Sequence, residues 1–297
     1  MTTTEHSRGG APRRDPVPVR TGLLRRRQEG PGYSLRPFPV VRRAYADGLG
    51  VAQRQHTIHA LVEADVSRAR PLLRSQVDAG GTRVSSTAWV AACVARAVEE
   101  YPIVQAHRWG RGTLVLFDDV DVSVQVDDVL ADGSHVVRSR VLRAANRRTV
   151  RDLSDEVHRA SAGGPVDRRR HRATTAFARF PRALRLAGIH AVTARPFLSK
   201  RLAGTVVVTS VGMFASRPGW GLPVSPAPLS VTVGGIGPRP VLVGGRVENR
   251  DHLSLTVSVD HDLVDGALAA RFTERLVDLV EHAHGLTGAE GPRRLDG

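Results

Sequence analysis

Alternating apolar and polar positions mark the strands that this chain is expected to form. Residues 120–126 carry valine at every second position, and residues 253–259 alternate Leu or Val with Ser or Thr. A period of two gives a strand one apolar face and one polar face. Runs of β-branched or alternating residues predict further strands over 57–66, 134–142, 205–209, 229–233 and 240–247. The last third of the chain is therefore expected to be rich in strands.

Apolar residues at helical spacing predict the helices. One runs from residue 85 or 86, where a serine can cap it, to Tyr101, because Pro102 stops it. Another follows residue 266, and its core-facing residues are Leu268, Phe272, Leu276 and Leu279. Shorter helices are expected over 40–53, with breaks at its two glycines, over 67–77 and over 149–160. Helices and strands mixed in this way predict an α/β domain.

Basic charge is concentrated in two segments. The 297-residue chain has a formal net charge of +14, and nearly all of its cationic residues are arginine; such a charge favours anionic partners. Residues 1–35 are rich in Gly, Pro, Ser and Arg without an apolar period, so we expect a disordered basic tail, with a shorter tail over 288–297. Residues 170–203 predict a helical insertion that packs on a subunit or contacts a membrane. Contact of the basic tail with nucleic acid or a membrane stays open.

Cysteine content and hydropathy narrow the class of protein. Cys93 is the single cysteine, so an internal disulfide is impossible, and its place in a helical run predicts a buried thiol. No spacing indicates a metal site. The chain has no apolar run of roughly 18 residues, the length that a membrane span needs, and no apolar segment near its start that indicates a secretory signal. We therefore expect a cytoplasmic protein.

His261 is the candidate for catalysis. It opens the pattern His-x-x-x-Asp-Gly, which ends at Asp265 and Gly266, between a predicted strand and a predicted helix. Gly266 allows the backbone to turn without a Cβ clash, and Asp265 lies where the helix dipole favours a carboxylate. An imidazole on such a loop can deprotonate a thiol, hydroxyl or amine that attacks a carbonyl. Taken alone, the pattern also fits a structural histidine or a metal ligand.

Several segments, in the same order along the chain, resemble one family. The catalytic domain of the dihydrolipoamide acyltransferases of 2-oxoacid dehydrogenase complexes has an active-site signature that resembles S-L-T-V-S-V-D-H-D-L-V-D-G at 254–266. The same domain has motifs similar to V-V-R-R-A-Y-A-D-G-L at 40–49, E-E-Y-P-I-V-Q-A at 99–106, T-V-V-V-T-S-V-G-M-F at 205–214 and the segment 223–235. The resemblance identifies residues 36–287 as an acyltransferase catalytic domain.

The resemblance implies a fold and a mechanism. The fold would be the two-layer sandwich of chloramphenicol acetyltransferase, an α+β mixed sheet flanked by helices that forms trimers. His261 would be the general base, and Thr209 of a neighbouring subunit would hydrogen-bond the oxyanion. Asp265 would hold the loop by pairing with a buried arginine of the first helix, Arg42 or, failing that, Arg43. Coenzyme A would enter as a substrate, with no metal.

Departures from the family pattern bear on function. Asp262 stands where the family usually has Arg or Lys, and Pro226 where many members have Asn. Lys200 is the only lysine and precedes a predicted strand, so we expect no lipoyl domain and no covalently bound lipoyl group. The acyl group would pass between coenzyme A, or another thioester, and a thiol, amine or hydroxyl. The protein would form a homotrimer or higher oligomer, and a separate lipoyl or acyl carrier is a candidate further partner. The alternative is a catalytically idle oligomeric scaffold or accessory subunit, which would have no use for His261.

Overall fold

The chain divides into two compact units, residues 1–39 and 40–297. The computed structural model describes residues 29–30, 33–34, 37–76, 83–129, 135–161, 165–211 and 217–287. In the first unit, β1 (Glu29–Gly30) pairs antiparallel with β2 (Tyr33–Ser34), within the predicted basic tail. The rest of the predicted tail 1–35 and the tail 288–297 lie outside the described residues.

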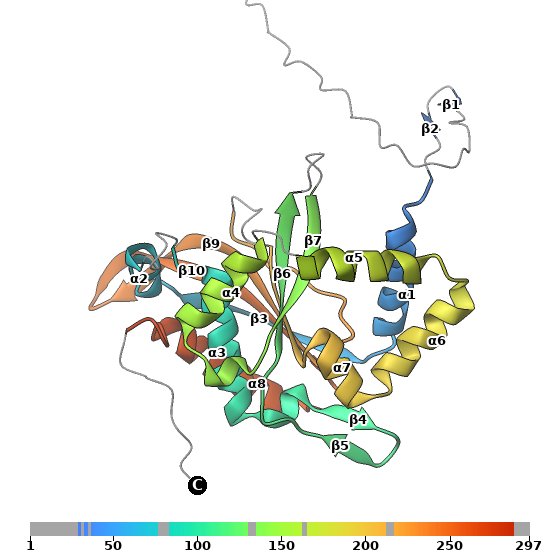
Figure 1. Cartoon of the computed structure of the whole chain (residues 1–297). Helices are drawn as coiled ribbons and strands as arrows, with labels where there is room; N and C mark the ends of the chain where they lie inside the picture. Colours follow the sequence, from blue (N-terminus) through green and yellow to red (C-terminus); the bar gives the residue numbers. More distant parts are fainter. Residues whose placement is uncertain are drawn as a thin grey trace, which may run out of the picture. The chain divides into compact units, whose positions relative to one another are not determined.

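A mixed sheet organises the second unit (Figure 1). In the described part of the chain, six strands form it in the order β3-β10-β9-β8-β6-β7. The short strand β8 runs parallel to β6 and β9, and the other neighbours are antiparallel. The strands are β3 (Thr57–Asp65), β6 (Val122–Val129), β7 (His135–Leu142), β8 (Val206–Ser210), β9 (Leu229–Val243) and β10 (Arg246–Asp260).

One predicted strand was wrong. Residues 240–247 do not form a strand of their own, because β9 continues to Val243 and the chain then turns at Gly244 and Gly245 into β10. Both glycines have positive φ, 55° and 82°, a backbone conformation that residues with a side chain rarely adopt. Two such residues in succession are typical of a tight hairpin turn.

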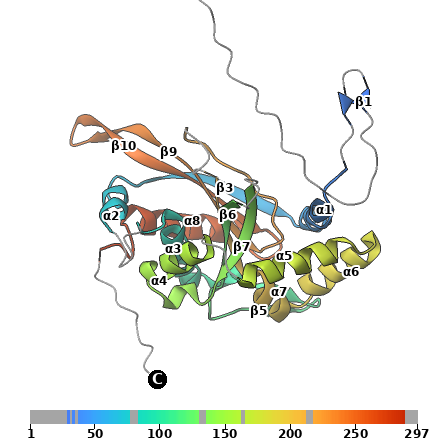
Figure 2. The ribbon, with the colours of Figure 1, turned by 45° about the horizontal axis from the view of Figure 1, so that its top comes forward.

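Helices cover one face of the sheet. Figure 2 shows α8 (Gly266–Glu281) and α3 (Ser86–Glu100) on the same side of β3, β9 and β10. The two helices contact each other, α8 contacts β3, and α3 contacts β6, β8 and β9. The remaining elements of this part are α2 (Ala69–Ser75), α4 (Val150–Ser161), the 3₁₀ turns η1 (Pro102–Gln105) and η2 (Ala145–Arg147), and the hairpin strands β4 (His107–Trp109) and β5 (Thr113–Val115).

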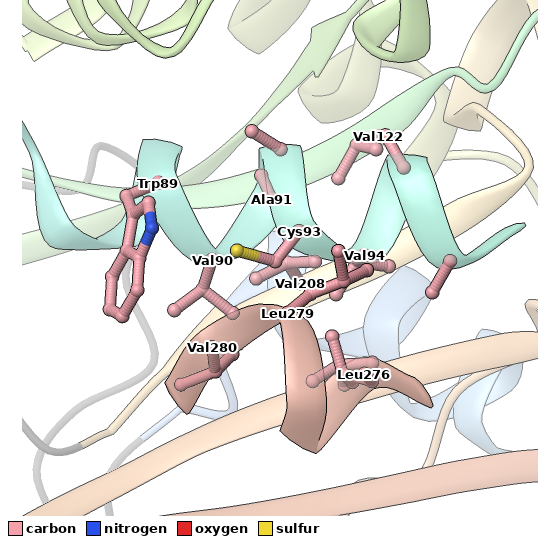
Figure 3. Close-up of a cluster of buried hydrophobic side chains, with 14 of the residues drawn as sticks. Trp89, Val90, Ala91, Cys93, Val94, Val122, Val208, Leu276, Leu279 and Val280 are labelled. Atoms are coloured by element: carbon pink, nitrogen blue, oxygen red, sulfur yellow. The ribbon is translucent and has the colours of Figure 1, made fainter. Parts of the chain in front are cut away.

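The hydrophobic core lies between these helices and the sheet (Figure 3). Phe272, Leu276 and Leu279 of the predicted apolar stripe are buried against α3 and β3, whereas Leu268 is half-buried. Cys93 is fully buried in the middle of α3, as predicted, and burial raises the pKa of its thiol well above the usual value. The helix begins at the predicted serine, because the Ser85 hydroxyl accepts a hydrogen bond from the Ala88 N–H.

The opposite face of the sheet carries a stripe of small hydroxyl residues. Segment 217–222 lies across this face, where the Trp220 indole N–H donates to the Val62 carbonyl at 3.0 Å. The approach is too close for side chains, since a Cβ at Gly234 would come within 2.1 Å of the Gly219 oxygen. The stripe comprises Ser230, Thr232, Ser254, Thr256 and Ser258, all of them buried.

The basic insertion packs on its own chain. It forms α5 (Pro165–Ala178), α6 (Arg182–Thr193) and α7 (Pro196–Ala203), so it starts at residue 165. Both α5 and α6 contact α1 (Val40–Ala52), which continues through its two glycines without the predicted breaks. Asp47 of α1 is buried and accepts a hydrogen bond from the Arg185 guanidinium at 2.8 Å. The insertion thus packs on its own subunit, and its contact with a membrane stays a prediction.

Hydropathy of the helices gives no membrane span. No helix among the described residues combines the length and the apolar character that crossing a bilayer demands.

Candidate active site

His261 lies on a turn that is fixed from both sides. The turn connects β10 to α8, and the His261 N–H donates to the His56 carbonyl at 2.8 Å. The Leu263 and Val264 N–H groups both donate to the Asp260 carbonyl at 3.1 Å. The His261 side chain is exposed, and no side chain among the described residues hydrogen-bonds its imidazole. The backbone is therefore held while the ring stays accessible, an arrangement that suits a base meeting an external substrate.

Asp265 organises the start of α8. It is the N-cap residue of the helix, and its carboxylate accepts a hydrogen bond from the Leu268 N–H at 2.7 Å. The expected ion pair with Arg42 is not present. Arg42 is exposed on α1, and the described residues show no ion pair from it or from Arg43 to Asp265. The physical reason is that α1 is engaged through Asp47 with the insertion helix α6, whereas Asp265 uses the backbone of its own helix.

Gly266 is not required by the sterics of the single chain. It is the first residue of α8, and a Cβ placed there would meet nothing within 4 Å. The predicted clash at this turn was therefore wrong for the chain by itself.

Thr209 is far from His261 within one chain. It lies on β8, on the same face of the sheet as the hydroxyl stripe, and is half-buried. The register pairs Thr209 with Thr232 and Thr232 with Thr256, five residues before His261. At about 3.3 Å per residue and about 4.8 Å between strands, this register puts the Cα atoms of Thr209 and His261 roughly 19 Å apart. A single copy cannot bring the two side chains to one substrate.

A polar network that sequence reasoning missed surrounds the residue after His261. The Asp262 carboxylate contacts the His56 ring nitrogen at 2.9 Å and the Arg108 guanidinium at 3.2 Å. The hydrogen bond to Asp262 raises the pKa of His56 above its usual value, and His56 holds the pKa of Asp262 below its usual range. Burial raises the pKa of the neighbouring Asp260. The signal in the sequence was Asp262 itself, which replaces a basic residue of the family pattern.

An open pocket adjoins this network. It has a volume of about 460 Å³ and lies between the β4–β5 turn and the turn that carries His261. Its lining comprises Arg111 and Gly112 of the hairpin turn, Thr113 and Leu114 of β5, Arg108 of β4, and Asp262 and Leu263. On the other side of the site, the Pro226 carbonyl accepts a hydrogen bond from the Gln55 amide at 3.1 Å, which ties the segment before β9 to the residue preceding His56.

Lys200 has a partly buried environment next to an aromatic ring. It lies within α7, and its ammonium group is 4.6 Å from the centroid of the Phe117 ring. Among the described residues, no group of three or more His, Cys, Asp or Glu side chains is placed to hold a metal ion.

Comparison with known sequences connects the C-terminal part of the chain with one family. Residues 199–287 match the family model of the 2-oxoacid dehydrogenases acyltransferase (catalytic domain). The chain is 36% identical over 80 residues to the human mitochondrial dihydrolipoyllysine-residue succinyltransferase component of the 2-oxoglutarate dehydrogenase complex. The aligned region covers 26% of this chain and 17% of that protein. The corresponding Saccharomyces cerevisiae component is 31% identical over 86 residues, 28% of this chain and 18% of that protein. The match thus spans less than a fifth of the length of these relatives.

Comparison with solved structures extends the likeness to most of the fold. A probable dihydrolipoamide acetyltransferase from Listeria monocytogenes superposes with a TM-score of 0.65 at 20% identity, over 89% of this chain and all of that one. The dihydrolipoamide acetyltransferase of Azotobacter vinelandii gives 0.63 at 19% identity, over 85% and 93% of the two chains. The predicted fold class is confirmed over most of the domain by these structures, and the sequence match to the family model covers residues 199–287.

Proposed function

We propose that this chain, a relative of the acyltransferase catalytic domain of 2-oxoacid dehydrogenase complexes, transfers an acyl group between coenzyme A, or another thioester, and a thiol, amine or hydroxyl. The observation that carries the proposal is His261, which has an exposed ring on a backbone fixed by β10, α8 and His56. An idle scaffold has no need of an accessible imidazole held in this way. The turn also lies within the segment that matches the family model.

The reaction follows from what an imidazole and a hydroxyl can do. The His261 imidazole takes the proton of the attacking thiol, amine or hydroxyl as that group bonds to the thioester carbonyl carbon. The carbonyl oxygen gains negative charge, and the Thr209 hydroxyl donates a hydrogen bond to it. When the carbonyl re-forms, the bond to sulfur breaks, and the leaving thiolate takes the proton back from His261. Atoms and charge balance without any other group.

The second residue must come from another copy. His261 and Thr209 of one chain are roughly 19 Å apart by the register of the sheet, so one substrate cannot touch both. A closed ring of identical chains would bring the His261 turn of each copy to the β8 strand of the next. We propose a homotrimer, or a larger assembly of trimers, as the active form.

Enzyme assays must identify the acyl group and its carrier. The sequence relatives are named as succinyltransferase components, so a succinyl thioester belongs among the donors to be tested. A lipoyl or acyl carrier on a separate chain is a further candidate partner in the transfer. The basic tail, as a contact for anionic surfaces, stays a prediction.

The test measures thiol release from a panel of acyl-coenzyme A thioesters, with and without free dihydrolipoamide. We expect His261→Ala to lower the rate by about 100-fold or more, the range of general-base catalysis, while the oligomer is retained. His190→Ala is the matched control, since it removes an exposed imidazole from α6 in the insertion. Equal turnover by His261→Ala and the wild-type chain would refute the assignment. An intact oligomer that turns over no thioester would favour the scaffold.

A further inference from the structure

The pocket beside His261 has an unbalanced positive charge. Arg108 and Arg111 both line it, together with a single carboxylate, Asp262. That carboxylate is shared between Arg108 and His56. Arg111 is exposed, and the described residues give its guanidinium no hydrogen bond or ion pair. Two guanidinium groups line the pocket, one without a partner in the described part of the chain and one oriented by a carboxylate. Each presents paired N–H donors, so together they are suited to binding an anionic oxygen group.

The position of the pocket limits which anion it can bind. Asp262 and Leu263 line it and directly follow His261, and consecutive Cα atoms are only about 3.8 Å apart. The pocket therefore adjoins the turn that carries the proposed base, and we place its anion on the acyl side of the reacting carbonyl. The phosphates of coenzyme A are separated from its thiol by the whole pantetheine arm, so they fit this position poorly. A carboxylate at the far end of a short acyl group fits it well.

The walls of the pocket suit the chain that would carry such a carboxylate. Leu114 is 43% exposed and lines the pocket on the hairpin side, while the half-buried Leu263 lines the side of the catalytic turn. Burial of methylene groups between these two apolar side chains is favourable. The pocket thus offers an apolar passage that leads to a cationic end.

We infer that this pocket is a subsite for the distal carboxylate of a dicarboxylic acyl group, with Arg111 as its principal ligand and Arg108 as the second. Asp262 acts as a positioning residue that holds Arg108 at the rim. The inference rests on the proposed acyl transfer, because it assigns the acyl group of that same reaction. It also explains why a carboxylate replaces the basic residue of the family pattern at position 262, since a carboxylate there orients an arginine from the β4–β5 hairpin.

The test compares two donors whose acyl groups have four carbons each. Succinyl-coenzyme A ends in a carboxylate, and butyryl-coenzyme A ends in a methyl group. We expect the wild-type chain to prefer the succinyl donor in kcat/KM, and Arg111→Gln to lower the succinyl-to-butyryl ratio by about 10- to 100-fold. Arg111→Lys should retain part of the preference, because it keeps the charge and loses the fork. Arg179→Gln, an exposed arginine of the insertion, is the control with an unchanged ratio.

Each outcome separates the inference from the proposed function. A ratio that Arg111→Gln leaves unchanged, or a wild-type chain that prefers butyryl, overturns the carboxylate subsite while acyl transfer stands. A loss of preference for coenzyme A over its dephospho form in Arg111→Gln would assign the arginine to a phosphate and overturn the inference. A change confined to the KM of the acceptor would overturn it also. A wild-type chain that turns over neither thioester refutes the proposed function itself.

Discussion

Asp265 should stabilise the domain through the start of α8 rather than through an arginine. Its carboxylate accepts the hydrogen bond of the Leu268 N–H, one of the backbone donors at a helix start that has no partner within the helix. The helix that it caps buries Phe272 and Leu276 in the core, so fraying at this end would loosen the turn that carries His261. Asp265→Ala removes the acceptor, whereas Asp265→Asn keeps an acceptor and removes the charge.

The two substitutions should differ in size. Replacing a capping side chain with alanine costs about 1 kcal/mol, in a range of about 0.5–2. Loss of the negative charge at a helix N-terminus adds about 0.3–1 kcal/mol. We therefore expect Asp265→Ala to lower the free energy of unfolding by about 1–2 kcal/mol, and Asp265→Asn by less than about 1 kcal/mol. For a domain of this size, 1 kcal/mol corresponds to a shift of about 2–4 °C in Tm.

Equilibrium unfolding in urea, followed by circular dichroism at one protein concentration, measures the difference. His261→Ala is the control, since truncation of an exposed side chain should change the free energy of unfolding by less than about 0.5 kcal/mol. The reasoning would be refuted if Asp265→Asn cost as much as Asp265→Ala. Such a result would mean that the charge of the carboxylate pairs with a cation, as the sequence first predicted for Arg42.

Further predictions concern the network, the insertion and the core. The pKa of His56 should lie above its usual value and fall towards it in Asp262→Asn. In the wild-type chain the ion pair is complete between the lowered pKa of Asp262 and the raised pKa of His56, and it is lost as pH rises through the latter; an NMR titration in which the substitution does not move the His56 pKa would contradict this. Asp47→Ala leaves the buried Arg185 without its carboxylate and should lower the free energy of unfolding by about 3–5 kcal/mol, with faster proteolysis within 165–203; unchanged proteolysis would count against the pairing. Phe272→Ala should cost about 3–5 kcal/mol in urea unfolding, and a loss below about 1 kcal/mol would mean that the core is packed differently.

The strands and helices with one clear period were predictable from the sequence. Residues 253–259 alternate without a break, and they form the C-terminal half of β10 with the apolar residues facing the core. The segment 86–100 carries small and branched apolar residues between a serine cap and Pro102, and it forms α3. In both cases local pattern and tertiary burial favour the same structure, so nothing in the fold overrides the pattern.

The misses arose where tertiary contacts decide. The glycines of α1 were expected to break the helix, but α5 and α6 pack along it and offset the cost of glycine in a helix. The strands β4 and β5 have three residues each, which is too short for an alternating apolar pattern to reveal them in the sequence. The Gly244–Gly245 pair was read as part of a strand, although two successive glycines between alternating segments favour a turn.

The candidate site was predictable as a set of residues and not as an arrangement. His261 and Asp265 follow from one contiguous motif, so their neighbourhood is fixed by the sequence itself. Thr209 could be named from its motif, but its distance from His261 depends on the order of the strands. The contacts of His56 and Arg108 with Asp262 join residues that are 206 and 154 positions apart, and no local pattern contains them.

The central claim is that His261 of one copy acts with Thr209 of the next, and mixed oligomers test it most directly. Co-expressed His261→Ala and Thr209→Val chains with different tags, purified through both tags, give trimers that contain both variants. Each such trimer has one intact His261–Thr209 pair among its three sites if the pair is formed between copies, so we predict about a third of the wild-type rate of thioester transfer. His261→Ala mixed with the His261→Ala, Thr209→Val double variant is the control without intact pairs. Activity of the mixed trimers no higher than that of the two parents would contradict the account.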